Sequence, residues 1–308
     1  MSSSKSSISY TWVSDLSRQG TLDLFSRASQ IKKKLKAGER IKSLKGRQIA
    51  LLFNEPSTRT KLSFQMAAHR LGAQCLIIDD FTTSSMSKGE TFLDTLWTLH
   101  SLGPDLMVVR CGNEELYENW VSQIDLPVIN GGWGAKSHPT QALLDVFTLL
   151  EQFKTLDGLK VVFVGDIDHS RVAASSIKLL QIFGAEVRVC APSGFCEKRP
   201  KSVPVLETLK EAITWCDVYF GLRVQLERHE GAAEKSKTFE QFQKNFSLDQ
   251  QGLQALGKKA VILHPGPINW GVEFQDCVEK DSRLLVRRQV ENGIYVRAAL
   301  MESFLEKR

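Results

Sequence analysis

The run Phe53-Asn54-Glu55-Pro56-Ser57-Thr58-Arg59-Thr60-Lys61 joins two stretches of sequence with different patterns. Residues 49–53, which lead into it, are continuously apolar, as is typical of a buried parallel strand. After it, apolar residues recur at the spacing of a helix with one apolar face: Leu62, Phe64, Met66, Ala67 and Leu71. The first amides of a helix are unpaired and its dipole favours negative charge. The junction of this strand and this helix is therefore a candidate anion site.

The side chains in this run suit an anion. Ser57 and Thr58 offer hydroxyl donors, and Arg59 offers a planar guanidinium that fits phosphate or carboxylate. A structural alternative is ordinary helix capping, which Ser and Thr commonly provide at a helix start. The rest of the sequence has to decide between these two interpretations.

Composition bounds the class of protein. The chain has 308 residues, enough for two domains, and a net charge of +5. Acidic and basic residues are interleaved, so the charge does not indicate a nucleic-acid surface, and we interpret the basic run at 32–36 as the solvated face of a helix. No apolar run is long enough to span a membrane, and residues 1–9 are polar rather than a secretory signal.

The six cysteines contain no C-x-x-C pair, and the six histidines show no H-x-x-x-H spacing. We therefore expect reduced thiols in a cytoplasmic protein and no metal centre. The G-x-G-x-x-G and Walker patterns are also missing from the sequence, so no nucleotide cofactor is expected.

Strand and helix patterns alternate along the chain, which predicts an α/β fold of two domains, each a parallel sheet with helices on both faces, linked by a helix. Strands are expected at 44–53, 74–78, 106–109, 128–130, 160–165, 186–190, 218–220 and 261–263. Helices are expected at 22–36, 62–72, 92–102, 114–123, 142–153, 172–183, 207–212 and 284–305. A polar stretch at 227–244 interrupts the alternation and is expected to be a mobile segment that closes over a site.

The expected first domain is 1–137 and the second 138–287, with 142–153 as the linking helix. The C-terminal helix, 288–308, is expected to pack back on the first domain. Glycines at 131, 132 and 134 are expected to form a loop after the strand at 128–130.

Polar or cationic residues follow nearly every expected strand. They are Ser57, Thr58, Arg59 and Thr60, then Arg110, His138 and Gln141, then Asp166, Arg171 and Arg223, and finally His264, which leads to Pro267. Open parallel sheets bind ligands at the carboxyl ends of their strands. Since arginines recur at these ends, the sequence predicts a site for a strongly anionic set of ligands.

Six linked motifs occur in the order and spacing of the carbamoyltransferases. They are Ser57-Thr58-Arg59-Thr60, Ser84 with Lys88-Gly89-Glu90, His138-Pro139-Thr140-Gln141, His169-Ser170-Arg171, Arg223-Val224-Gln225 with Glu227-Arg228, and His264-Pro265-Gly266-Pro267. The chain resembles this family over essentially its whole length. Thr140 and the His-Pro-Gly-Pro segment favour members that act on aspartate, because ornithine enzymes usually carry Cys and His-Cys-Leu-Pro there.

The resemblance implies transfer of the carbamoyl group of carbamoyl phosphate to L-aspartate, which gives N-carbamoyl-L-aspartate for pyrimidine biosynthesis, without metal, cofactor or covalent nucleophile. Carbamoyl phosphate would be bound by Ser57, Thr58, Arg59, Thr60, Arg110, His138 and Gln141. Aspartate would be bound by Lys88, Arg171, Arg223 and Gln225, with Gly266 and Pro267 in a closing loop. Ser84 and Lys88 would come from a neighbouring subunit, which implies a homotrimer with shared sites.

Several alternatives stay open at this point. The acceptor could be ornithine or another amine, or the protein could be a silent carbamoyltransferase-like scaffold; the retained Arg59, Lys88, His138 and Gln141 argue against silence. A regulatory chain or a dihydroorotase is a possible partner. Trp270 and Ala174 stand where many bacterial members have arginine, which leaves domain closure and regulatory assembly open.

Overall fold

The computed structural model describes residues 9–10, 16–79, 88–112, 120–121, 123–224 and 232–306, without the side chains of residues 9–10 and 232–238. The chain divides into two compact units: Met1–Leu144 together with Val290–Arg308, and Asp145–Gln289. Both divisions fall inside helices, the first in α5 (Pro139–Phe153) and the second in α10 (Val286–Leu305). The expected boundary at residue 137 lies just before α5 instead.

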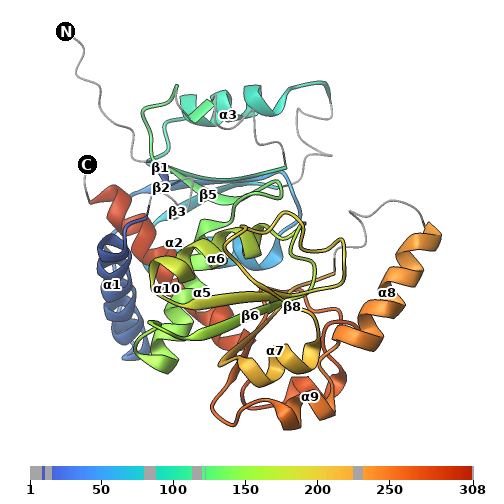
Figure 1. Cartoon of the computed structure of the whole chain (residues 1–308). Helices are drawn as coiled ribbons and strands as arrows, with labels where there is room; N and C mark the ends of the chain where they lie inside the picture. The colour runs from blue at the N-terminus through green and yellow to red at the C-terminus, as the bar shows by residue number, and fades with distance from the viewer. Residues whose placement is uncertain are drawn as a thin grey trace. The chain divides into compact units, whose positions relative to one another are not determined.

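Unit 1 contains a sheet of five parallel strands in the order β1-β5-β4-β2-β3. The strands are β1 (Ser9–Tyr10), β2 (Gln48–Phe53), β3 (Gln74–Ile78), β4 (Leu106–Cys111) and β5 (Val128–Trp133). The helices of this unit include α1 (Arg18–Lys36), α2 (Thr58–Arg70) and α3 (Phe92–Ser101). Figure 1 shows α3 on one face of the sheet and α2 on the other.

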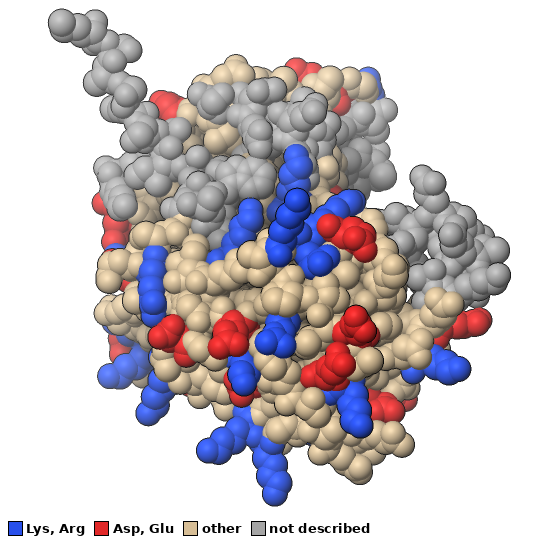
Figure 2. Space-filling model, in the orientation of Figure 1, with Lys and Arg blue, Asp and Glu red and all other residues tan. Residues whose placement is uncertain are grey.

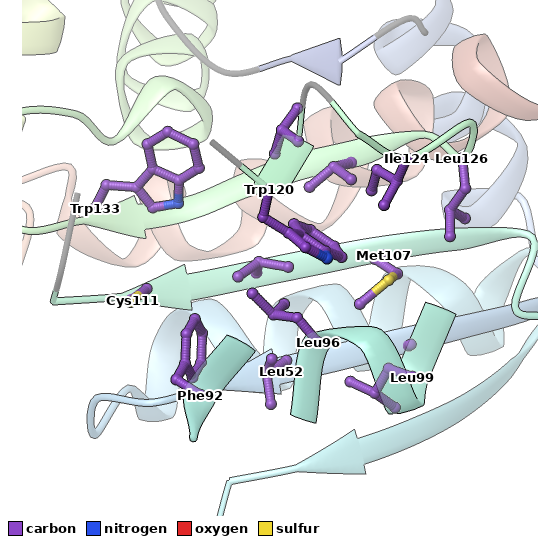
Figure 3. Packing of buried hydrophobic residues seen from close by; sticks show 14 residues of the cluster. Leu52, Phe92, Leu96, Leu99, Met107, Cys111, Trp120, Ile124, Leu126 and Trp133 are labelled. Atoms are coloured by element: carbon purple, nitrogen blue, oxygen red, sulfur yellow. The ribbon is translucent and has the colours of Figure 1, made fainter. Parts of the chain in front are cut away.

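The core beneath α3 helps to explain why the central strands β2 and β4 are apolar over several consecutive residues. Phe92, Leu96 and Leu99 of the helix pack against Leu52 of β2 and Met107 of β4, as Figure 3 shows. All of these side chains are buried, because helices cover both faces of a parallel sheet.

Unit 2 repeats this architecture with the strand order β10-β9-β6-β7-β8, again all parallel. Its strands are β6 (Lys160–Val164), β7 (Glu186–Cys190), β8 (Val205–Leu206), β9 (Val218–Gly221) and β10 (Val261–Leu263). Its helices are α6 (Arg171–Ile182), α7 (Leu209–Trp215), α8 (Ala232–Phe246), α9 (Gln250–Ala255) and the 3-10 helix Asp276–Lys280. In Figure 1, α6 lies on one face of this sheet and α7 on the other. The predicted fold class is therefore confirmed.

Some local predictions were wrong. At 227–244, where no helix was expected, the chain forms α8 from residue 232 onward, and buried Phe242 stacks on Phe246 with 5.7 Å between the ring centroids. An apolar pair spaced by four residues helps to seat a helix whose sequence is mostly polar. Residues 131 and 132, expected in a loop, continue strand β5, because Trp133 still pairs with Cys111 of β4.

The apolar face expected for α2 is also split in two. Phe64, Ala67 and Leu71 are buried, whereas Leu62 and Met66 are 51% and 43% exposed. At 100° per residue, positions 62 and 66 stack on one face of a helix and positions 64, 67 and 71 on another. The sheet covers the second face, so the first is left as an apolar surface.

The basic run at 32–36 is only partly the solvated face expected from the sequence: Lys33 and Lys34 are exposed, but its two ends contact α10. The Lys32 ammonium donates to the Asn292 side chain at 2.8 Å, and Lys36 pairs with Glu291 at 3.1 Å, so this part of α1 is held against α10. On the face drawn in Figure 2, basic and acidic side chains are interspersed over the described surface. Within the described residues, no helix is both long and apolar enough to cross a membrane.

Candidate active site

In unit 1 the predicted anion-binding residues lie where the strand order reverses. From β2 the chain adds β3 on one side and β4 on the other, so the reversal lies between β2 and β4. There Phe53 pairs with Arg110, and the Asn54 amide donates to the Arg110 carbonyl at 2.9 Å. Open α/β sheets bind ligands at the carboxyl ends of such strands. The Ser57–Thr60 run therefore follows one of the two strands that frame this position, and Arg110 lies near the end of the other.

Helix α2 begins at Thr58, earlier than the apolar pattern predicted, so the motif itself forms its first turn. Ser57 is the N-cap residue, but its side chain makes no capping hydrogen bond. The capping interpretation of this serine is thus not supported, although its carbonyl accepts from the Lys61 amide at 3.3 Å. Thr58 and Arg59 are exposed, whereas Thr60 is buried. The helix start presents unpaired amides, two hydroxyls and a guanidinium to a ligand.

Arg110 is buried at the end of β4 and held from two sides. Its Nε lies 3.3 Å from a carboxylate oxygen of Glu55, and its Nη1 donates to the Gly131 carbonyl of β5 at 3.4 Å. These contacts fix the guanidinium fork on the rigid sheet. Glu55 was not singled out from the sequence, although it stands inside the motif run.

His138 brings the third motif to the same place. Its Nε2 lies 3.4 Å from the Thr60 hydroxyl, and both residues are buried. Its carbonyl accepts from the Gln141 amide at 3.1 Å, so His138 stands at the start of α5 and Gln141 in the first turn. The structure therefore brings α2 and α5 together through Thr60 and His138, as the motif order alone could not show.

Arg297 of α10 braces this arrangement from inside the unit. It is 3% exposed, and its Nη1 donates to the Ser63 hydroxyl at 2.5 Å and its Nη2 to the Thr140 hydroxyl at 3.5 Å. Ser63 in turn donates to the Thr60 carbonyl at 2.9 Å. The cation thus ties α10 to the first turns of both α2 and α5. The sequence offered no signal for it, since it lies in a helix outside every motif.

We expect Arg297→Met to lower the free energy of unfolding by about 2 kcal/mol, because two buried hydroxyls lose a charged partner. In the reaction that the resemblance implies, the rate at low carbamoyl phosphate should fall about tenfold, as the support of Thr60 is lost. Chemical denaturation and steady-state kinetics measure the two effects. Arg288→Met, an exposed arginine on the same helix, is the matched control. Equal behaviour of the two variants would contradict the bracing role.

A pocket opens beside the start of α2. It is lined by Phe53, Glu55, Pro56, Ser57, Thr58, Lys61, Leu62 and Asp79. Lys61 pairs with Asp79 at its rim. No group of three or more His, Cys, Asp or Glu side chains within the described residues could hold a metal ion.

Unit 2 has a second reversal of strand order, between β6 and β9. Val164 pairs with Gly221, and the Leu222 amide donates to the Val164 carbonyl at 2.8 Å. Gly165 has a φ of +135°, and a Cβ there would lie 2.4 Å from the Leu222 carbonyl oxygen. Glycine is therefore required for the close approach of the two strand ends.

The two predicted acceptor-binding arginines follow these strand ends. Arg171 is the first residue of α6, whose N-cap is the Ser170 side chain, which accepts from the Ala173 amide at 3.1 Å. Arg223 comes directly after Leu222. Between β6 and α6, the buried Asp166 carboxylate accepts from the His169 amide and lies 2.9 Å from its ring Nδ1, which fixes the turn that carries Arg171.

The His264-Pro265-Gly266-Pro267 segment follows β10, with a cis peptide bond before Pro267. Its continuation is tied to the segment after Arg223 by Glu273, whose carboxylate accepts from the amides of Val224 at 2.8 Å and Asn269 at 2.7 Å. Burial raises the pKa of the Glu273 carboxyl, while the donated hydrogen bonds oppose that rise. The sequence did not single out Glu273.

The remaining predicted residues are placed unevenly. Lys88 is described and exposed. Ser84 and Gln225 lie outside the described residues, as do Glu227 and Arg228. None of the six cysteines, all of which are described, forms a disulfide. Burial raises the pKa of the Cys190 and Cys216 thiols to about 12, so neither has the character of a reactive nucleophile.

Both units carry polar and cationic residues at a reversal of strand order, as is typical of the class of α/β proteins that bind anionic ligands. Two family models cover most of the chain. The carbamoyl-P binding domain of aspartate/ornithine carbamoyltransferase matches residues 9–151, and the Asp/Orn binding domain matches residues 157–304. The chain therefore belongs to the aspartate/ornithine carbamoyltransferase family.

Individual relatives show which members of this family the chain is similar to. The chain is 38% identical over 298 residues to the aspartate carbamoyltransferase catalytic subunit of Caldanaerobacter subterraneus, covering 96% of this chain and 97% of that one. It is 41% identical to the same subunit of Aliarcobacter butzleri, covering 85% and 87%. A crystal structure of aspartate transcarbamoylase from Trypanosoma cruzi, in complex with carbamoyl phosphate and aspartate, matches with a TM-score of 0.87 and 30% identity over 96% of each chain.

Proposed function

We propose that the chain is an enzyme that transfers the carbamoyl group of carbamoyl phosphate to the amine of L-aspartate. The products are N-carbamoyl-L-aspartate and phosphate, and the reaction belongs to pyrimidine biosynthesis. The observation that carries this proposal is the position of the motif residues at both reversals of strand order. One reversal bears the donors suited to a phosphate, and the other bears two arginines suited to the carboxylates of aspartate.

In unit 1 carbamoyl phosphate is held at the start of α2. Ser57, Thr58 and Arg59 bind the phosphate together with the unpaired helix amides, and Arg110 adds a second guanidinium. Thr60, Arg110 and His138 donate to the carbonyl oxygen, and Gln141 holds the carbamoyl NH₂. The contact between Thr60 and His138 supports this grouping, because both would have to reach one small carbonyl group.

In unit 2 the two carboxylates of aspartate are taken by Arg171 and Arg223, with Gln225 assisting. Arginine suits this task because its planar fork donates two parallel hydrogen bonds to one carboxylate. Ornithine carries an amine where aspartate has its second carboxylate, so two arginines favour aspartate. The named relatives agree with this choice.

The reaction asks for orientation and electrostatic stabilisation rather than a covalent intermediate. The neutral amine of aspartate attacks the carbamoyl carbon, and the carbonyl oxygen gains charge in the tetrahedral transition state. The bond to the phosphate oxygen then breaks, and the amine proton ends on the leaving phosphate. Donors fixed in advance stabilise that oxygen without reorganising during the reaction. Arg110 meets this condition, since Glu55 and Gly131 hold it before any substrate arrives.

The active assembly is a homotrimer in which Ser84 and Lys88 are supplied by a neighbouring subunit. The apolar surface on unit 1 supports an assembly: Leu62 and Met66 of α2 are exposed, as are Leu76 and Ile77 of the edge strand β3. Exposed apolar side chains on a helix and on an edge strand fit protein–protein contacts. The six cysteines without disulfides fit a cytoplasmic location.

A two-substrate assay tests the proposed function. Purified protein is given carbamoyl phosphate with aspartate or with ornithine, and the carbamoylated product is measured. We expect N-carbamoyl-L-aspartate from aspartate and at least about a hundredfold slower product formation from ornithine. A site built to pair arginines with two carboxylates rejects an analogue that lacks one of them. Product from ornithine alone would show that the acceptor is ornithine and not aspartate. No product from either would favour the alternative of a catalytically silent carbamoyltransferase-like protein.

A further inference from the structure

A buried chain of hydrogen bonds in unit 2 leads to the start of the His264–Pro267 loop. The His264 amide donates to the side-chain oxygen of Gln289 at 3.1 Å. The Gln289 NH₂ group donates to Asp145 Oδ1 at 2.8 Å, and Asp145 Oδ2 accepts from the Ser176 hydroxyl at 3.2 Å. Asp145 and Gln289 are 1% and 2% exposed, and His264 and Ser176 are equally buried.

The two ends of this chain dictate how Gln289 is oriented. A backbone amide can only donate, so Gln289 must turn its oxygen toward His264. A carboxylate can only accept, so the NH₂ group of Gln289 must face Asp145. A glutamine at position 289 satisfies both partners at once, whereas a glutamate would put a second carboxylate against the first.

Burying a carboxylate and an amide costs free energy unless every polar group is paired, so these buried polar residues are expected to do more than fill space. Apolar side chains of the same size would fill this part of the core at lower cost. The polar chain gives something that apolar packing does not, which is a fixed position for one backbone amide. That amide belongs to His264, the first residue of the loop that is predicted to contact the substrates.

The loop itself is ordered from this point onward. The Gly266 amide donates to the His264 ring at Nδ1 over 2.9 Å, and the ring packs edge-on to Phe274 at 5.3 Å between centroids. A shift of the His264 backbone would therefore move Gly266 and Pro267 with it. Asp145 stands four positions after Gln141 in helix α5. The series of hydrogen bonds therefore starts from the helix whose first turn carries Gln141, a residue predicted to bind carbamoyl phosphate.

We infer that Gln289, oriented by Asp145, is a positioning residue for carbamoyl transfer: it holds the His264–Pro267 loop in the place where Gly266 and Pro267 meet the substrates. The inference rests on the proposed function, in which this loop closes on the bound substrates. Gln289 does not touch substrate. It acts through the backbone of His264, and Asp145 acts through Gln289.

The test compares four variants with the wild type: Gln289→Leu, Gln289→Glu, Asp145→Asn and the double variant Asp145→Asn with Gln289→Glu. In the double variant the amide and the carboxylate exchange places, so the His264 amide still finds an oxygen at position 289 and positions 145 and 289 still form a donor–acceptor pair. The value of kcat/KM for aspartate is measured at saturating carbamoyl phosphate, well below the melting temperature, and each melting temperature is recorded.

We expect Gln289→Leu to lower kcat/KM at least about tenfold and Gln289→Glu to lower it further, because the latter adds repulsion to the lost hydrogen bond. Asp145→Asn alone keeps an acceptor for Gln289 and should cost less than about fivefold. The double variant should recover to within about fivefold of wild type, a coupling that independent sites do not show. This recovery is the decisive result and does not depend on the folding of the leucine variant.

The outcomes separate the two proposals. A wild-type enzyme without product from aspartate would overturn the proposed function and this inference with it. An active wild type whose variants melt at lower temperatures but keep kcat/KM would overturn the inference alone, since Gln289 would then serve stability only. A double variant no better than Gln289→Glu would likewise overturn it.

Discussion

Replacing Arg59 with alanine should lower kcat about a thousandfold, the upper end of the loss expected when one preorganised donor to a transition state is removed. Arg59 stands in the first turn of α2, directly before Thr60, and its side chain is exposed. In the proposed site it neutralises the leaving phosphate, whose charge grows as the bond to the carbamoyl carbon breaks. Steady-state kinetics with aspartate and carbamoyl phosphate measure the loss.

Two further variants make this experiment specific. Arg59→Lys keeps the charge but loses the planar fork, so its kcat should lie between those of the wild type and the alanine variant. Arg70→Ala removes an exposed arginine from the last turn of the same helix and should leave kcat within about twofold of wild type. Since Arg59 is exposed, its replacement should also leave the melting temperature unchanged. Wild-type turnover by Arg59→Ala would remove the anion-binding role of the α2 start.

The fold was predictable because the pattern of apolar residues that indicates it extends over many residues of each strand and helix. Apolar strands and amphipathic helices alternate from β2 to β10, and no single residue decides that alternation. The two-residue strands β1 and β8 could not be predicted, because they carry no periodicity of their own and exist through pairing with β5 and β7. Helix α8 was missed for a related reason: its apolar contacts rest on a few phenylalanines in a mostly polar segment.

The candidate site was predictable where its residues stand next to strand ends. Arg110 and the Ser57–Thr60 run follow two strands that the sequence also predicted, and the strand order then makes those strands neighbours. Sequence cannot show which strands become neighbours, so the reversals of strand order were visible only in the structure. The link between Thr60 and His138 is of the same kind, since seventy-eight positions separate the two residues.

The residues that hold the predicted site residues in place could not be identified from the sequence. Arg297, Glu273 and Gln289 lie outside the catalytic motifs, and a buried polar side chain looks like a surface residue when only its letter is known. Their roles depend on burial and on partners distant in the chain, such as Ser63 for Arg297 and Asp145 for Gln289. These are properties of packing, and packing appears once the helices have been placed on the sheet.

The second large effect is expected from mixing two inactive variants. Lys88→Ala should be inactive because the proposed site lacks its donated ammonium, and His138→Ala because the carbonyl oxygen loses a donor. If His138 and Lys88 act in the same chain, every site in a mixed assembly keeps one defect and no activity returns. If Lys88 acts in a neighbouring chain, some sites in a mixed assembly combine an intact His138 with an intact Lys88.

The symmetry of the proposed trimer fixes how much activity should return. In a ring of three chains, any mixture of two of one variant with one of the other creates a single intact site. Random mixing of equal amounts makes about three quarters of the trimers mixed, so about a quarter of wild-type activity should be recovered. Each variant unfolded and refolded alone is the control. Native mass spectrometry must show mixed trimers, because mixed trimers without activity would mean that Lys88 serves the site of its own chain and that the sites are not shared.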